Sequence, residues 1–203
     1  MYTLFWSPGS ASMAPHAMLE ELSVPYELTR VNLDEPRDSR YLQLNPWNRV
    51  PTLLVDGKPI YEAAAICMHL CDRHPEKGLA PLPGSAERAL YYQWLLFLAD
   101  TLQPAFMRVY RPSHCSSDPA DEVAIKEKGL KDVAQVWATL DRLLEGRSWL
   151  VGERFSAADI YLHMLYTWDF DMSGLARRHA NLAALFRRIH ERPAVARVAE
   201  LNM

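Results

Sequence analysis

The most informative stretch of this chain is LNPWNRVPTLLVDGKPIYEA, residues 44–63. Its first part is an irregular loop that ends at Val50-Pro51, and the residue before a proline favours extended backbone. Because Pro51 has no N–H, a strand that begins there leaves the backbone groups of Val50 available to an extended, peptide-like ligand. Asp56-Gly57 is typical of a hairpin turn between short apolar runs. The stretch therefore predicts a binding edge and a hairpin, with Glu62 at the start of the next helix.

The residues around this stretch predict a small mixed-sheet domain. The order is strand, helix, strand, then two hairpin strands and a helix, which fits an α/β fold over residues 1–76. Between the second strand and the hairpin, residues 32–45 are polar and irregular, with a short helix possible. The expected elements are strands at 2–6 and 26–31, a helix at 13–22, hairpin strands at 52–55 and 58–61, and a helix at 63–72.

A change of pattern follows this first domain. Residues 77–85 are rich in proline and glycine and predict a linker, whereas residues 86–203 have a helical pattern throughout. Within that part, Ser156 stands three residues before Asp159, which is the spacing of a capping box, and Phe155 and Ile160 have the spacing of a hydrophobic staple. The almost wholly apolar run at 160–168 therefore predicts a buried core helix.

Composition excludes several classes of function. The chain has 203 residues and a formal net charge of -3, so it has no basic field for nucleic acid or for an anionic membrane surface. Cys67 and Cys71 lie one helical turn apart in an apolar segment and are expected as buried thiols, which suits a reducing cytoplasm. We expect neither a signal peptide nor a membrane-spanning segment from the pattern of apolar and charged residues. The histidines show no metal-like grouping.

The ordered pattern of residues 45–70 resembles the cytosolic glutathione transferases. Shared features are Asn-Pro-x-x-x-Val-Pro-x-Leu, then Asp-Gly, then an acid that leads into an Ala-Ile helix. The segment 149–159, with its capping box, resembles the lead-in to the central helix of the same enzymes. The resemblance implies a thioredoxin-like N-terminal domain that binds glutathione, an all-helical C-terminal domain, glutathione as co-substrate without a metal, and a homodimer.

The chemistry is expected in the loop after the first strand, SPGSASMAPH at residues 7–16. A thiol with a pKa of about 8.5 is mostly protonated at neutral pH, and lowering that pKa by two units needs about 2.7 kcal/mol. A helix N-terminus supplies part of this stabilisation. A serine hydroxyl that donates to the sulfur would supply about 1.5 to 3 kcal/mol. Ser12 and Ser10 are the candidates, although serines also cap helices without any other role.

This loop also resembles the bacterial beta-class pattern Ser-Pro-Gly-Ala-Cys-Ser, but Ala11 replaces the active cysteine of that class. Ser12 matches the serine of theta-like classes and Ser10 a hydroxyl position of zeta-like enzymes, so Ser12 is ranked first. The segment at 94–104 lacks the Asn, Glu, His and Lys that serve the beta-class site. The departures imply another class or weak conventional activity.

The resemblance also assigns contacts to glutathione. The backbone of Val50, held by a cis Pro51, would pair with the cysteinyl part, while Glu62 and the Ala63 N–H would hold the γ-glutamyl end. The family often has serine where this chain has Ala63. Arg49 would reach the glycyl carboxylate or is simply a solvated loop arginine.

Three aromatic residues are candidates for an apolar co-substrate pocket or for the core: Trp6, Phe106 and Tyr110.

The function implied is attack of the glutathione thiolate on a small hydrophobic electrophile or a peroxide. Two alternatives stay open. One is a non-catalytic glutathione-binding or protein-interaction member of the same fold, since fold does not fix function. The other is a glutathione-dependent isomerase, whose typical Ser-Ser-Cys-Ser loop is absent here.

Overall fold

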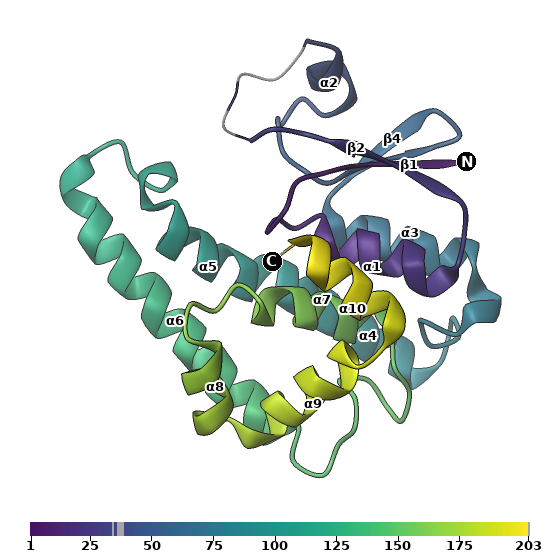
Figure 1. The fold of residues 1–203 in the computed structure, drawn as a ribbon. Helices are drawn as coiled ribbons and strands as arrows, with labels where there is room; N and C mark the ends of the chain where they lie inside the picture. Colours follow the sequence, from purple (N-terminus) through teal and green to yellow (C-terminus); the bar gives the residue numbers. More distant parts are fainter. Residues whose placement is uncertain (34, 36–38, 203) are drawn as a thin grey trace.

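The computed structural model describes residues 1–33, 35 and 39–202. Part of the irregular segment expected at 32–45 and the last residue of the helical segment expected at 86–203 therefore lie outside the described residues. The described chain forms a four-stranded sheet with helices, followed by a set of helices (Figure 1). This arrangement confirms the predicted thioredoxin-like α/β domain followed by an all-helical domain.

The sheet has the strand order β2-β1-β3-β4. β1 pairs in parallel with β2, and the other neighbouring pairs are antiparallel. Gly57, with a φ of 81°, completes the hairpin turn between β3 and β4. The strands confirm the predicted ones, except that the second ends one residue earlier. Their bounds are β1 Tyr2–Trp6, β2 Tyr26–Arg30, β3 Thr52–Val55 and β4 Lys58–Tyr61.

Helices α1 (Met13–Leu22) and α3 (Ala63–Arg73) cover the face of the sheet that points to the helical domain, and α2 (Ser39–Leu44) lies beyond its other side (Figure 1). Leu4 and Leu53 of adjacent strands are fully buried together with Leu19 of α1 and Ile66 of α3. This shared core fixes the ends of β1 and β3 relative to the N-termini of the two helices. A short turn, η1 (Pro75–Lys77), follows α3.

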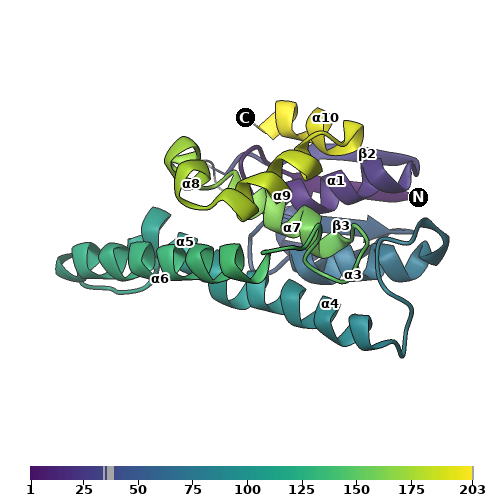
Figure 2. The same ribbon diagram turned by 90° about the horizontal axis from the view of Figure 1, so that it is seen from below.

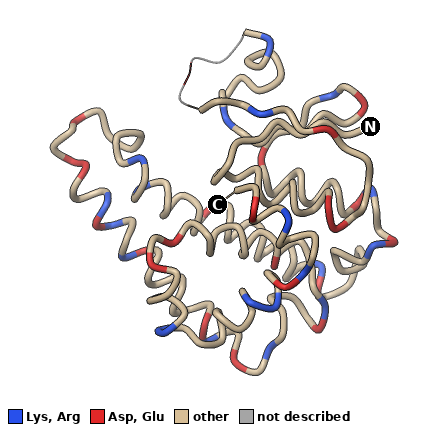
Figure 3. The backbone as a smooth tube through the Cα atoms, in the orientation of Figure 1, with Lys and Arg blue, Asp and Glu red and all other residues tan. Residues whose placement is uncertain are grey.

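The second part is helical throughout, with α5 and α6 as an extended antiparallel pair (Figures 1 and 2). Its elements are α4 (Ala86–Phe97), η2 (Leu98–Leu102), α5 (Gln103–Tyr110), η3 (Pro112–His114), η4 (Pro119–Asp121), α6 (Glu122–Leu143), α7 (Ala157–Tyr166), α8 (Met172–Arg178), α9 (Ala180–His190) and α10 (Pro193–Asn202). None of the helices in the described part is long and apolar enough to cross a membrane. Lys and Arg are mixed with Asp and Glu over both domains (Figure 3).

The helix from α4 to α5 is continuous but changes its winding at η2, a π-helical segment. Pro104 has no N–H to donate one turn back, which explains why regular α-helical bonding is not kept there. The Gln103 N–H instead bonds the Leu98 carbonyl, five residues earlier. This segment joins α4 to α5, which runs outward along α6 (Figures 1 and 2).

The predicted capping box is present at the start of α7. The Ser156 N–H donates to Asp159 Oδ2 over 2.8 Å, and the Leu150 N–H donates to Oδ1 over 2.9 Å. Every residue of α7 is buried, as the apolar run at 160–168 predicts. The helix begins at Ala157 because Ser156 is its N-cap, and it ends at Tyr166, two residues before the end of that run. The helix is therefore the centre of the second core.

The last helix joins the two domains. α10 packs along α1, and Arg192 makes a bidentate ion pair with Glu21, with both N–O distances 2.7 Å. Arg197 of α10 pairs with Glu20 of α1 over 2.8 Å. Bidentate pairs of this kind fix geometry as well as charge. They hold α1, and the loop that precedes it, against the helical domain.

Candidate functional site

The loop between β1 and α1 holds a compact set of hydroxyl groups. The Ser10 Oγ donates to the Ser7 carbonyl over 2.7 Å and lies 2.7 Å from the Ser12 Oγ. The Ser12 Oγ lies 3.1 Å from the same carbonyl and accepts from the Ser7 N–H over 3.2 Å. Gly9, with a φ of 63°, makes the turn that brings Ser10 back over Ser7. The two candidate hydroxyls are thus brought together at the N-terminus of α1.

These two serines differ in exposure. Ser12 has no exposed surface, whereas Ser10 is half-buried. Ser12 stands at the N-cap of α1, yet its side chain makes no capping hydrogen bond. Sequence reasoning ranked Ser12 first; exposure favours Ser10 as the hydroxyl that an incoming ligand meets, with Ser12 directly behind it.

Hydrogen bonds from buried polar side chains fix the loop that ends at Pro51. Asn45 Nδ2 donates to the Arg49 carbonyl over 2.8 Å and to the Thr52 Oγ1 over 3.1 Å. The Tyr41 hydroxyl donates to the same Arg49 carbonyl and lies 3.0 Å from Thr52 Oγ1. Sequence reasoning did not give these side chains a role. In the sequence, the only signal for this role is that polar residues stand on both sides of the Val-Pro step. The structure buries three of them: Tyr41, Asn45 and Thr52.

The Val50–Pro51 peptide bond is cis, as the resemblance implied. Val50 is half-buried and Pro51 is buried, and β3 begins directly after them at Thr52. Arg49 is exposed and forms no ion pair with the described residues. Its guanidinium is therefore available to an anionic ligand beside Val50.

Glu62 has an unusual backbone conformation. Its φ is 73° and its ψ is 111°, in a region that favours glycine, and it directly precedes α3. The first amide of α3 with a helical acceptor is that of Ile66, which bonds the Glu62 carbonyl over 2.9 Å. The amides of Ala63 and Ala64 therefore have no acceptor within the helix. An exposed carboxylate and free helix amides at one point suit a ligand with both an amine and a carboxylate.

The three aromatic candidates lie in different surroundings. Phe106 has no exposed surface and packs against the rings of Tyr110, Trp137 and Trp168, which favours the core role left open for it over the pocket role. The Tyr110 hydroxyl donates to the Trp168 carbonyl, and Trp6 packs against the His16 ring. Two of the rings that bury Phe106 come from distant parts of the chain, Trp137 on α6 and Trp168 after α7.

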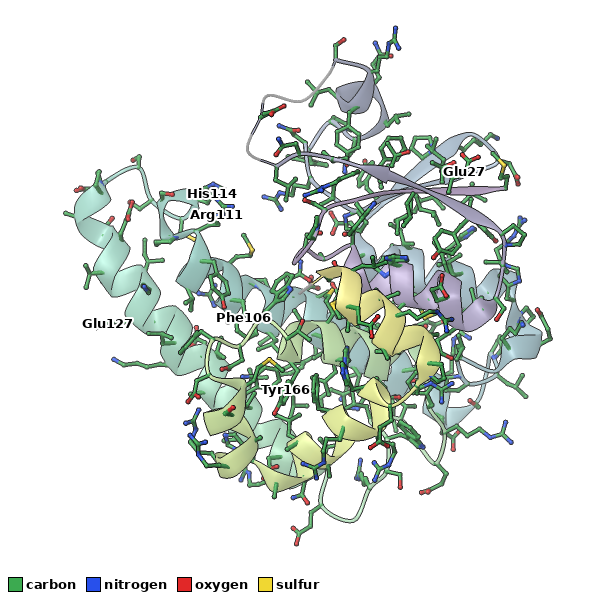
Figure 4. All side chains as sticks on the ribbon, in the orientation of Figure 1. Glu27, Phe106, Arg111, His114, Glu127 and Tyr166 are labelled. Carbon is green, nitrogen blue, oxygen red and sulfur yellow. The ribbon has the colours of Figure 1, made fainter. Side chains whose placement is uncertain are left out.

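A cavity of about 290 Å³ lies where the loop after β1, the end of β2 and the residue after α5 meet. It is lined by the neighbours of Trp6 and Tyr110 in the sequence, Ser7 and Arg111, and by residues that follow β2. Figure 4 shows Arg111 and His114 together beyond the end of α5, on the side of the α5–α6 pair that is nearer to the N-terminal domain. Sequence reasoning missed this cavity. Its described lining is Ser7, Pro8, Arg30, Val31, Asn32, Leu33 and Arg111.

The described residues hold no group of three His, Cys, Asp or Glu side chains that suits a metal ion. Cys67 and Cys71 are free, buried thiols, as predicted. Burial raises the pKa of both, and the Tyr91 hydroxyl donates to the Cys71 sulfur over 3.4 Å. These thiols are therefore unreactive core groups. Position 11 in the loop after β1 is alanine and has no thiol.

Comparison with known proteins finds matches to one group of families in both domains. Residues 1–72 match the family described as "Glutathione S-transferase, N-terminal domain", and residues 100–200 match "Glutathione S-transferase, C-terminal domain". Glutathione S-transferase GST-4.5 of Xanthomonas campestris pv. campestris is 32% identical over 92% of this chain and 91% of its own length. Glutathione S-transferase GstA of Escherichia coli O157:H7 is 31% identical over 95% and 94%.

Among solved structures, a sphingomonad glutathione S-transferase complexed with glutathione superposes with a TM-score of 0.85. It is 31% identical in sequence, and the superposition covers 98% of each chain. The similarity therefore extends over the sheet, the helices and the connection between them.

Proposed function

Because this chain belongs to the glutathione S-transferase family, we propose that it binds glutathione at the N-terminus of α1 and activates the thiol for attack on an electrophile. The observation that carries the proposal is the pair of hydroxyls at Ser10 and Ser12, which lie 2.7 Å apart where a helix begins. Such a position already favours an anion. The enzyme is a glutathione transferase, and glutathione is its co-substrate.

We propose that Ser10 donates to the glutathione sulfur, since it is the more exposed hydroxyl. Its hydrogen now bonds the Ser7 carbonyl, so it would turn outward when the ligand arrives. Ser12 would then donate to Ser10 and complete a chain of hydrogen bonds from the buried loop to the sulfur. Each charge-assisted hydrogen bond contributes about 1.5 to 3 kcal/mol. Together with the helix end, this is adequate to lower the thiol pKa by one to two units without a general base.

The rest of glutathione would follow the surface between this loop and α3. The backbone of Val50 would pair with the cysteinyl part, beside cis Pro51. Glu62 would accept from the γ-glutamyl amine, and the Ala63 amide would donate to its carboxylate, which the free first turn of α3 supports. Arg49, which is exposed, would reach the glycyl carboxylate.

The reaction would be direct displacement or addition by the bound thiolate. A carbon–sulfur bond forms as the leaving group departs with its electron pair, and the thiol proton has already gone to solvent. The protein would contribute thiolate formation and the proximity of the two reactants. No covalent enzyme intermediate is needed, which agrees with alanine at position 11.

The decisive experiment is steady-state turnover of glutathione with a chlorodinitrobenzene, next to calorimetric binding of glutathione. Turnover that falls in Ser10→Ala while binding persists would support the transferase reaction. Binding without turnover of this compound, of a peroxide or of an unsaturated ester would favour the non-catalytic alternative. Isomerisation of a cis double bond that consumes no glutathione would favour the isomerase.

We further propose a homodimer in the cytoplasm. Large apolar side chains on α4, Leu90 and Leu96, are 43% and 50% exposed in the single chain, which supports an interface over that helix. The free, buried thiols of Cys67 and Cys71 are compatible with a reducing compartment. Light scattering of the purified protein tests the dimer.

A further inference from the structure

The cavity at the junction of the two domains is positively charged. Arg30 ends β2, and Arg111 follows α5, so the two side chains reach the cavity from different domains. Neither arginine forms an ion pair with any of the described residues. The described residues that line the cavity include no carboxylate. Two unpaired guanidinium groups at one recess form a site for an anion.

This cavity adjoins the proposed position of the thiolate. Ser7 lines the cavity, and its carbonyl accepts hydrogen bonds from both Ser10 and Ser12. A molecule that fills the cavity therefore lies next to the hydroxyl pair. The volume of about 290 Å³ is at the lower end of the range for small-molecule sites, about 300 to 1,000 Å³. The cavity suits a small acid rather than an extended polymer.

We propose that the cavity binds the second substrate and that this substrate is an electrophile carrying a carboxylate, with Arg30 and Arg111 as specificity-determining residues. The proposal rests on the proposed function, because it needs a glutathione thiolate beside the cavity. The apolar side chains of Val31 and Leu33 would contact the carbon skeleton of the substrate while the arginines hold its anion. The chain is therefore expected to prefer an acidic electrophile, although its net charge is -3.

The test compares two compounds that react by the same step, a chlorodinitrobenzene and a chlorodinitrobenzoate that differs by one carboxylate. In both, the thiolate forms a carbon–sulfur bond at the chlorine-bearing carbon, and chloride leaves with the electron pair of the broken bond. We expect Arg30→Gln and Arg111→Gln each to lower kcat/KM for the acid by about 5- to 10-fold. The loss for the neutral compound is expected to be smaller, because that compound has no carboxylate for the arginines to hold.

The matched control is Arg147→Gln, an exposed arginine in the loop between α6 and α7. It should leave both substrates unaffected. Raising the ionic strength should lower kcat/KM for the acidic compound but not for the neutral one, since salt screens exposed charges. Direct binding of the two glutathione conjugates, with and without the carboxylate, gives the same comparison without turnover.

The outcomes separate this proposal from the one on which it rests. Turnover of the neutral compound with no preference for the acid, or equal losses for both compounds in the arginine variants, would overturn the anion site and leave the transferase function intact. A loss of glutathione affinity in Arg30→Gln and Arg111→Gln would mean that the cavity holds the carboxylate of glutathione itself, which also overturns it. No glutathione binding and no turnover of either compound would overturn both proposals.

Discussion

The side-chain amide of Asn45 donates to the Arg49 carbonyl over 2.8 Å, directly before the Val50–Pro51 bond. Asn45 is 2% exposed, and its Oδ1 accepts from the Trp47 N–H over 3.1 Å. One side chain therefore bonds both the start and the end of the loop that presents Val50. Buried polar groups with all partners satisfied fix a local structure, and removing one partner leaves the others unpaired.

Replacing Asn45 by alanine is expected to destabilise the fold by about 1 to 3 kcal/mol, because the Trp47 N–H loses its acceptor and the Arg49 carbonyl loses a donor. Glutathione affinity should fall with it, since Val50 is no longer held in place. Urea unfolding and calorimetry measure the two effects. Asn181→Ala, which removes a bond to the Asp141 carbonyl in the helical domain, is the control. It should reduce stability but not affinity. Equal loss of affinity in both variants would contradict a positioning role for Asn45.

Glu62 is expected to lower the stability of the fold through its strained backbone while its carboxylate contributes to glutathione binding. At its φ of 73°, glycine is less strained than any other residue. Glu62→Gly should therefore be more stable than Glu62→Ala by about 1 kcal/mol in thermal or urea unfolding. Both variants, and Glu62→Gln, should bind glutathione more weakly because the carboxylate is gone. Equal stabilities of the glycine and alanine variants would show that the strain is absent.

A buried histidine is expected to make the fold sensitive to acid. His163 is 2% exposed and stacks on Phe186 with ring centroids 4.6 Å apart. Burial, with a further contribution from His190, lowers the pKa of His163 to about 3. The unfolded chain, with a pKa near 6.5, therefore binds more protons between these two values. Stability should fall as the pH drops below about 6.5, by about 1.4 kcal/mol per pH unit.

The variant His163→Phe keeps an aromatic ring in the stack and removes the imidazole that is protonated on unfolding. Urea unfolding between pH 6.5 and pH 5 should show a smaller loss of stability than in the wild type, by up to about 2 kcal/mol. His114→Phe changes an exposed histidine and should keep the slope of the wild type. An unchanged slope in His163→Phe would mean that other groups control the acid sensitivity.

The fold followed from local signals in the sequence. Asp56-Gly57 marked the hairpin, Val50-Pro51 marked the start of β3, and Ser156 with Asp159 marked α7. Each of these signals is set by the conformational preference of a few adjacent residues. They therefore do not depend on what packs against them.

The details of the site depended on contacts between distant segments. Ser12 is closed off because the loop folds back on the Ser7 carbonyl, which adjacent residue types do not predict. Phe106 is buried by Trp137 and Trp168, which come from other parts of the helical domain. Arg30 and Arg111 meet at one cavity only through the packing of the two domains. A single sequence does not reveal such meetings.

The most direct test of the central claim is the ultraviolet absorbance of the glutathione thiolate bound to the wild type, titrated across neutral pH. The account predicts thiolate at pH 7 and a rise of the thiol pKa by about 1 to 2 units in Ser10→Ala, with a smaller rise in Ser12→Ala. A larger rise in Ser12→Ala would reverse the roles of the two serines. Bound glutathione that stays a thiol at pH 7 in the wild type would contradict the claim that this loop activates it.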